Sequence, residues 1–254
     1  MNKFTFAVLL VFWINYSTSF NVSSQTTNKK IEAPEWSLPG SASHNQVPPP
    51  ANFHRAAITD NTTVGIFEGQ SDIGAALVPG SSSFNPVTGQ YTIVSAGYNI
   101  WYFRDEFRYL WKKSSGDFSF AANINFPDTA GYFDRKAVLV IRQSLEDNSK
   151  EAMVALHGGG LMHLAYRPEN GQNMKEMKVS QRSAMRIGIE KRGDSFSIFV
   201  SMKGEPMQQI GSYVQLHFDE PFYLGIGFCS HQPVTVDKVI ISNVVLENEA
   251  GKIH

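Results

Sequence analysis

Residues 151–167, EAMVALHGGGLMHLAYR, form two short runs of alternating residues joined by three glycines. Side chains of a β-strand alternate between the two faces of its sheet, so each run predicts a strand with one apolar face. A loop made of the three glycines would place His157 opposite Leu161 and Glu151 opposite Arg167. The stretch therefore predicts a β-hairpin whose second face carries histidines and charged residues.

The run before this hairpin, RKAVLVIRQ, also alternates and predicts a third strand beside it. If Arg142 pairs with Glu151, then Lys136 lies across from His157. The three strands would share one polar face, with Ala155 and Ala165 between the polar residues Lys136, Arg142, Glu151, His157, His163 and Arg167. Their opposite face is apolar enough to form a core.

Similar short β-type runs recur from about residue 64 onward, separated by turn sequences such as KKSSGD, RPENG and KRGD. No segment shows a long apolar period of 3.6 residues. More than ten strands in fewer than 200 residues predict an all-β, two-sheet jelly-roll sandwich over residues 64–248, with a short tail at 249–254.

The first twenty residues have the layout of a secretory signal peptide: Lys3, an apolar run over residues 4–14, and then small polar residues. That run is too short to span a bilayer, and the alternative is a short buried helix. A signal peptide over residues 1–20 predicts a secreted or periplasmic protein with no transmembrane segment in the mature chain. Residues 21–63 are rich in Ser, Thr, Asn and Pro and predict an N-terminal arm or linker.

The charge and cysteine content of the chain further limit the classes of protein to which it can belong. The 254 residues carry 22 basic and 23 acidic side chains, a net charge of −1, which provides no large field for nucleic acid. The single cysteine, Cys229, allows no internal disulfide. It lies in an apolar run, so we expect a buried structural thiol rather than a nucleophile.

Several segments resemble a bacterial concanavalin A-like (laminin G-like) secreted domain family. They are FEGQSDIG, VTGQYTIVSAGYNIW, RDEFRYLWKKSSGDFSFAANI and IISNVVLEN, within residues 64–248. Relatives of this kind accompany glycoside hydrolases or carry the label "biopolymer transporter Tol". The resemblance implies a jelly roll in which Asp72, Asp105 and Asp117 are structural. It implies carbohydrate as the ligand class without choosing an activity, because this fold serves lectins, hydrolases and lyases.

Two interpretations of the polar face remain open: a concave surface that binds ligand, or an ordinary outer face in contact with water. Five basic or imidazole groups against one acid favour an acidic glycan in the first case. Trp101, Trp111 and His231 could complete a sugar-binding surface, although Trp111 could equally pack in the core. Gly225 and Gly227, on the strand that leads to His231, could admit a ligand or bend the strand.

Catalysis is a further hypothesis. Hydrolysis of a glycosidic bond normally uses two carboxyl groups, and the polar face offers only Glu151. A lyase would use His157 and His163 as base and acid, with Arg142 neutralising a substrate carboxylate. A non-enzymatic interaction domain of the cell envelope is the third alternative. No cofactor or metal site is predicted, and calcium binding is left open.

Overall fold

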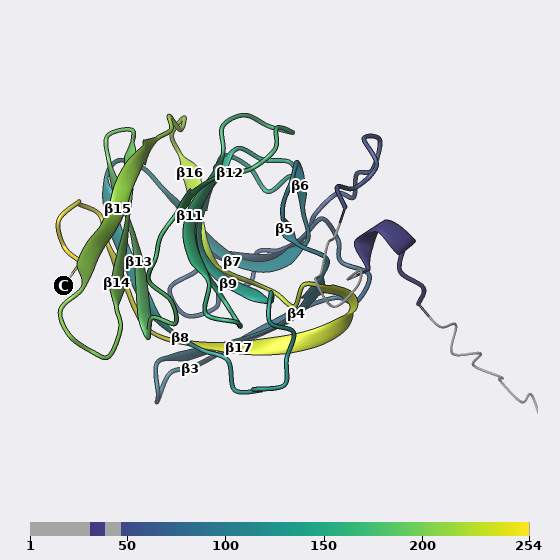
Figure 1. The fold of residues 1–254 in the computed structure, drawn as a ribbon, viewed down its shortest axis with the longest axis horizontal. Coiled ribbons are helices and arrows are strands. Elements are labelled where there is room, and N and C mark those ends of the chain that lie inside the picture. Colours follow the sequence, from purple (N-terminus) through teal and green to yellow (C-terminus); the bar gives the residue numbers. More distant parts are fainter. Residues whose placement is uncertain (1–30, 39–46, 254) are drawn as a thin grey trace, which may run out of the picture. The chain divides into compact units, whose positions relative to one another are not determined.

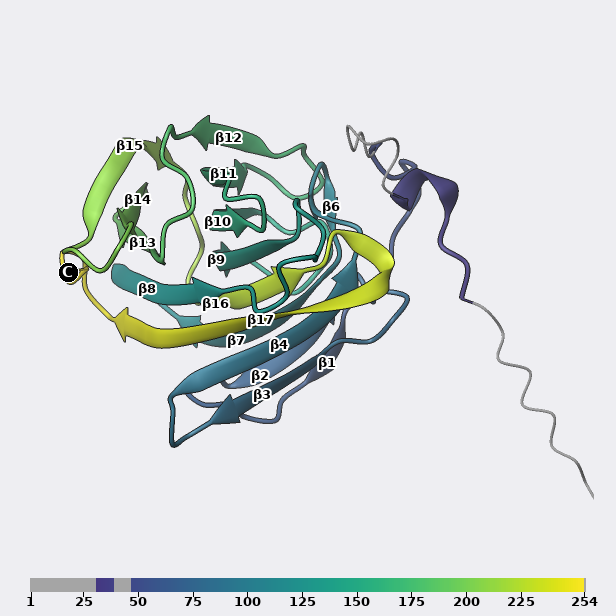
Figure 2. The same cartoon turned by 60° about the horizontal axis from the view of Figure 1, so that its bottom comes forward.

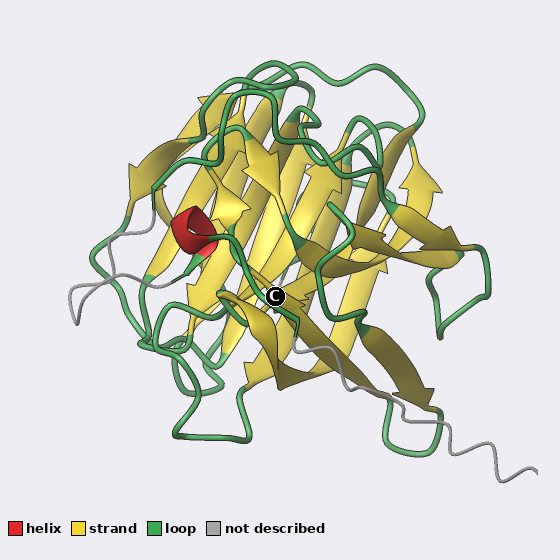
Figure 3. Ribbon diagram, turned by 90° about the vertical axis from the view of Figure 1, so that its right-hand side faces the viewer, coloured by secondary structure: helices red, strands yellow, loops and turns green. Residues whose placement is uncertain are grey.

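Two antiparallel sheets account for most of the chain that the computed structural model describes, residues 31–38 and 47–253 (Figures 1 and 3). The first sheet has eight strands, in the order β1 (Ile58–Asp60), β2 (Gly69–Ile73), β7 (Phe107–Ser114), β16 (Phe222–Cys229), β9 (Lys136–Arg142), β10 (Glu151–His157), β11 (Met162–Arg167) and β12 (Lys175–Lys178). The second has seven, in the order β15 (Gln208–Gln215), β14 (Ser195–Ser201), β13 (Arg186–Arg192), β8 (Phe118–Asn125), β17 (Gln232–Glu247), β4 (Gln90–Gly97) and β3 (Ser81–Asn85).

This arrangement confirms the predicted all-β, two-sheet sandwich. Figure 2 shows β8, β17, β4 and β3 of the second sheet side by side. A separate hairpin, β5 (Ile100–Trp101) and β6 (Arg104–Asp105), belongs to neither sheet. A 3-10 helix, η1 (Glu35–Ser37), is the one helical element in the described residues, none of which form a helix long and apolar enough to cross a membrane.

The register predicted from the glycine-linked hairpin is confirmed. Glu151 pairs with Arg167 and with Arg142, and His157 pairs with Lys136. The amide of His157 donates to the carbonyl of Leu161 at 2.9 Å, which closes the three-glycine loop. A two-residue alternation fixes the face of every side chain, so one correct pair determines all the others.

Both faces of the three central strands are buried. Toward the second sheet, side chains such as Leu139, Val154 and Leu164 join the main core. The opposite face, which we expected to be open to ligand or water, carries a second apolar cluster: Ile73, Ile100, Phe107, Tyr109, Trp111, Val138, Val140, Met153, Ala155, Ala165, Met174 and Cys229. The polar face is therefore largely covered, and a cavity remains at one end of it.

Trp111 and Cys229 belong to this second cluster. The indole nitrogen of Trp111 donates to the hydroxyl of Ser71 at 2.9 Å, and the residue is only 6% exposed. Trp111 thus packs in the core, the alternative that the sequence left open. Burial raises the pKa of the Cys229 thiol to about 12, so the thiol is protonated at neutral pH.

Described parts of the N-terminal arm lie against the sandwich. Trp36 in η1 packs edge-on to Tyr98, with ring centroids 5.1 Å apart, and Arg55 forms an ion pair with Glu106. β1 begins at Ile58, before the boundary expected at residue 64. The predicted signal peptide, residues 1–20, and residues 21–30 and 39–46 of the arm lie outside the described residues.

The two glycines of β16 are required by their neighbours. A Cβ at Gly225 would overlap the backbone carbonyl of Leu110 on β7, and one at Gly227 would lie 2.6 Å from the ring of Phe107. A neighbouring strand and an aromatic ring, rather than a ligand, use the space that these glycines leave.

We predict that Gly225→Ala lowers the free energy of unfolding by about 3 kcal/mol, because the added methyl meets a backbone atom that cannot move aside. Gly159→Ala is the control, since its Cβ would lie 3.3 Å from the nearest atom, and it should cost less than about 1 kcal/mol. Urea denaturation of both variants checks the difference, and equal losses would contradict the packing argument.

Candidate functional site

The predicted polar face separates into two groups of residues. At one end of the strands, Arg142, Glu151 and Arg167 form an ion cluster with Asp105 of β6. At the other end, the remaining predicted residues line a cavity. The two ends have different chemistry, and only the second has room for a ligand.

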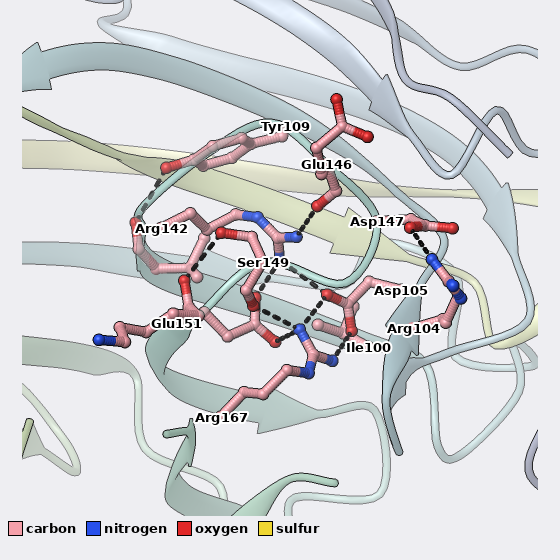
Figure 4. Close-up of polar contacts among 12 residues, drawn as sticks. Ile100, Arg104, Asp105, Tyr109, Arg142, Glu146, Asp147, Ser149, Glu151 and Arg167 are labelled. Carbon is pink, nitrogen blue, oxygen red and sulfur yellow. Dashed lines mark hydrogen bonds and ion pairs between the residues drawn. The ribbon is translucent and has the colours of Figure 1, made fainter. Parts of the chain in front are cut away.

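The ion cluster is closed to solvent. Asp105 accepts from Arg142 Nη1 at 2.8 Å and from both terminal nitrogens of Arg167, at 2.8 and 2.6 Å (Figure 4). Glu151 pairs with Arg142 and lies 3.3 Å from Arg167 Nη1. All four side chains have no measurable exposed surface. Bidentate contacts of this kind are the strongest that a guanidinium makes with a carboxylate.

Two cations and two acids make the cluster electrically neutral when all are ionised. Burial raises the pKa of Asp105, but the charges of Arg167 and Arg142 outweigh burial and lower it overall. Burial also raises the pKa of Glu151, to about 7, and Asp105 adds to this while the arginines oppose it. Backbone carbonyls of Ser144, Glu146, Ser149 and Gln172 accept from the remaining nitrogens of the arginines, so these nitrogens are occupied inside the protein.

Arg142, Glu151 and Arg167 were candidate ligand-binding or catalytic residues, and the structure places none of them at the cavity. The reason is Asp105, which lies 37 residues before Arg142 and comes from a hairpin outside the sheet. With Asp105 in place, all three residues have ion-pair partners inside the protein. We therefore do not include them in the proposed site.

The cavity has a volume of about 230 Å³. Five of its lining residues were predicted from the sequence: Trp101, Lys136, His157, His163 and His231. The others are Asn99, Tyr102, Asp134, Leu161 and Glu176. Its volume is below the ~300–1,000 Å³ of typical small-molecule sites, which suits a small ligand or one unit of a larger one.

His163 is held in one orientation by Glu176 of β12, with Nδ1 2.9 Å from the carboxylate. Burial lowers the pKa of His163, and the hydrogen bond from His163 lowers the pKa of Glu176 to about 2. At neutral pH this makes Glu176 an anion and His163 a neutral ring that donates through Nδ1–H. Nε2 then carries a lone pair, and no group in the described residues donates to it.

His157 is 5% exposed, and neither of its ring nitrogens makes a hydrogen bond within the described part of the chain. Asp134 Oδ1 lies 3.5 Å from Nδ1, a long contact that favours the protonated ring. Burial lowers the pKa of His157 to about 3 despite this acid. The ring of His163 lies edge-on to that of His157, 5.2 Å away.

Lys136 and Trp101 adjoin the two histidines. Lys136 Nζ donates to the side chain of Asn99 at 2.7 Å and lies 5.5 Å from the centroid of the Trp101 ring. Trp101 is half-buried and stacks on His163 at 5.5 Å, with an interplanar angle of 4°. Burial lowers the pKa of Lys136.

Two cavity residues have left-handed backbone conformations. Tyr102 has φ of 53° and His231 has φ of 65°, and the ring of His231 stacks on Tyr132 at 5.7 Å. A non-glycine residue in this region costs ~1–3 kcal/mol, and such conformations are concentrated at functional sites. The strain therefore supports the cavity as the candidate site.

The charge of the cavity differs from the expected excess of cations. Arg142 and Arg167 are neutralised in the ion cluster, and burial keeps His157 and His163 uncharged at neutral pH. Of the cations predicted for the face, Lys136 alone remains at the cavity, where two acids also lie. The argument for an acidic glycan therefore loses its basis.

Sequence reasoning missed the acids beside the histidines. Glu176 lies on β12, opposite Ala165, and extending the predicted sheet by the short run KEMK would have placed it there. Asp134 lies in the turn that precedes β9. Within residues 31–38 and 47–253, no group of three or more His, Cys, Asp or Glu side chains is placed to hold a metal ion.

Comparison with known proteins supports the fold alone. No family model and no curated protein matches the sequence. A functionally unknown protein from Saccharomyces cerevisiae matches with TM-score 0.51 and 14% identity, over 67% of this chain and 93% of that one. An alginate lyase of polysaccharide lyase family 7 matches with TM-score 0.42 and 10% identity, over 76% and 94% of the two chains. A β-glucanase from Bacillus licheniformis matches with TM-score 0.42 and 12% identity, over 65% and 80%.

Of these three, the yeast structure alone exceeds a TM-score of 0.5. The particular bacterial family and its Tol label stay predictions from the sequence.

We predict that Arg167→Met lowers the free energy of unfolding by about 3–5 kcal/mol, because it leaves the carboxylates of Asp105 and Glu151 buried with one cation between them. Arg192→Met is the matched control: its side chain is 67% exposed and pairs with Glu190 at 3.4 Å, so it should cost less than about 1 kcal/mol. Thermal and urea denaturation measure both, and a similar small loss in each would mean that the cluster adds little stability.

We also predict a pH-dependent difference between the wild type and His157→Gln. The folded protein takes up a proton on His157 only near pH 3, whereas the unfolded chain does so near pH 6.5, so acidification favours unfolding. Between pH 7 and pH 5 the wild type should lose about 2 kcal/mol relative to the variant, at ~1.4 kcal/mol per unit of pKa. Using the difference cancels titration common to both proteins, such as that of Glu151, and parallel pH profiles would refute the prediction.

Proposed function

We propose that the protein binds a neutral carbohydrate in the cavity of Trp101, His157 and His163. The observation that carries the proposal is the pair of buried, uncharged imidazoles: both ring nitrogens of His157 and Nε2 of His163 lack hydrogen-bond partners among the described residues. A neutral imidazole offers one acceptor and one donor, which matches the hydroxyl groups of a sugar. Buried polar groups are normally satisfied, so such atoms beside a cavity favour a ligand that completes them.

The aromatic and charged residues of the cavity fit the same ligand class. Trp101 and Tyr102 provide rings on which the apolar face of a sugar can pack, while Lys136 and Asn99 provide polar groups. Asp134 and Glu176 at the cavity disfavour a carboxylated or sulfated sugar, because each would repel an anion. We therefore propose a neutral sugar in place of an acidic one.

A reaction on the bound carbohydrate is the second candidate. The observation that favours it is the pairing of His163 with Glu176, which leaves Nε2 as a lone pair able to accept a proton. Asp134 and His157 form a second pair of a carboxylate and an imidazole. Either elimination or hydrolysis would use these groups rather than Glu151. A non-enzymatic envelope domain is the third candidate, and a secreted or periplasmic location rests on the N-terminal sequence alone.

The proposal predicts that Trp101→Ala and His163→Leu each weaken binding of the retained glycan by at least about tenfold, since each removes a group that contacts the sugar. Retention and calorimetry with a panel of neutral and acidic glycans measure this. His217→Ala is the control, because His217 is exposed and contacts Asp194 away from the cavity.

If the same incubations give new products, detected by mass, that are absent with His163→Leu, the protein catalyses a reaction on the bound carbohydrate, which is the second candidate. Retention of acidic glycans only would contradict the charge argument. A panel with no retained glycan would refute the proposed function.

A further inference from the structure

A second cavity, of about 310 Å³, adjoins the first at His157, which lines both. Its walls come from the end of β8 and the loop after it, from the glycine turn between β10 and β11, and from the segment before β13. They include Phe126, Thr129, Arg135, Gly158 and Ser183. This cavity lies at the end of the sandwich, past the strand face on which the first cavity is built.

Arg135 is the charged side chain of this second cavity and is 3% exposed. Its Nη1 donates to Asp237 at 2.6 Å, and its guanidinium lies 4.9 Å from the ring of Phe126. Nε is buried and makes no hydrogen bond with any described residue. Asp237 and Phe126 thus fix the guanidinium, while its Nε–H donor has no hydrogen-bond partner among the described residues.

The glycine turn packs directly against this side chain. A Cβ at Gly158 would lie 2.7 Å from Arg135 Nε and 3.0 Å from the carbonyl oxygen of Tyr132. A Cβ at Gly160 would overlap the hydroxyl of Ser183, at a backbone φ of 85°. A larger residue at either position would collide with Arg135 or Ser183, which line the second cavity. Gly158 and Gly160 therefore do more than close a hairpin, because they let these walls of the second cavity form beside His157.

Three polar atoms without partners belong to residues that line the second cavity, namely the two ring nitrogens of His157 and Nε of Arg135. His157 is 5% exposed, so its nitrogens gain little from bulk water. A ligand confined to the first cavity would leave the nitrogen of Arg135 unsatisfied. A ligand that continues past His157 could place a hydroxyl oxygen near it, and a hydroxyl is both a donor and an acceptor.

We propose that the carbohydrate site continues from the first cavity past His157 into the second, so that the ligand is an oligosaccharide of at least two neutral units. This inference rests on the proposed function. It adds the length of the ligand and assigns to Arg135 and the turn of Gly158 a role in binding its second unit. His157 contacts the ligand at the junction of the two units.

The test is calorimetric titration of the wild type with glucose, mannose and xylose and with their β-linked oligosaccharides of two to six units. Affinity should rise at least about tenfold from one unit to the longer members of the series that binds. Thr129→Trp fills the second cavity and should remove this gain while leaving the affinity for the single sugar unchanged.

Thr88→Trp is the matched control: Thr88 is exposed in the turn between β3 and β4 and lines neither cavity. A melting temperature equal to that of the control shows that Thr129→Trp is folded. Hydrogen exchange of the wild type gives an independent readout, because a bound oligosaccharide should protect amides of residues 158–160 and 183 and a single sugar should not.

Equal affinity for one unit and for longer chains, or a gain that survives in Thr129→Trp, would overturn this inference and leave the proposed function intact. A wild type that binds no sugar of any length would overturn both. An affinity that rises with oligosaccharide length in the wild type and in Thr88→Trp, but not in Thr129→Trp, supports both this inference and the proposed function.

Discussion

The contact of Asp105 with Arg142 and Arg167 is the interaction on which the candidate site depends. Asp105 ends the hairpin of β5 and β6, and the arginines end β9 and β11 of the large sheet. Ion pairs without exposed surface are costly to break, because the partner that remains is a buried charge. This contact therefore fixes a hairpin that belongs to neither sheet at a defined place over the strands.

The position of the hairpin in turn creates the cavity. Trp101, at the end of β5, stacks on His163, and Ile100 offers its carbonyl to Lys136. Without this cover the histidines would lie in contact with water, and their pKa values would stay near the ordinary range. With it they are buried and neutral, which gives the cavity its hydrogen-bonding groups and leaves Lys136 as the one predicted cation beside them. The ion cluster that stabilises the fold thus also fixes the cavity in which we propose that the ligand binds, at the opposite end of the same strands.

The sequence predicted the sandwich and the register of its central hairpin because both follow from local alternation. Leu161 is four residues from His157, and a three-glycine loop leaves few ways to pair them. The ion-pair partner of a charged side chain does not follow from local alternation. Asp105 is separated from Arg167 by 62 residues, and nothing in either segment specifies the other. The charge of the site was therefore predicted wrongly, although the six charged and imidazole residues of the three strands had been placed on one face.

The sequence did contain one indication that the polar face is covered. Val138, Val140 and Met153 share that face with the charged residues, and all three are completely buried. A strand face in contact with water rarely repeats large apolar residues at every other position, because each exposes surface that water disfavours. A face that mixes such residues with arginine and glutamate instead indicates a covering element that brings opposite charges with it. Apolar residues within a charged face thus predict burial, and burial predicts that a partner for each charge must be sought elsewhere in the chain before any charge is assigned to a ligand.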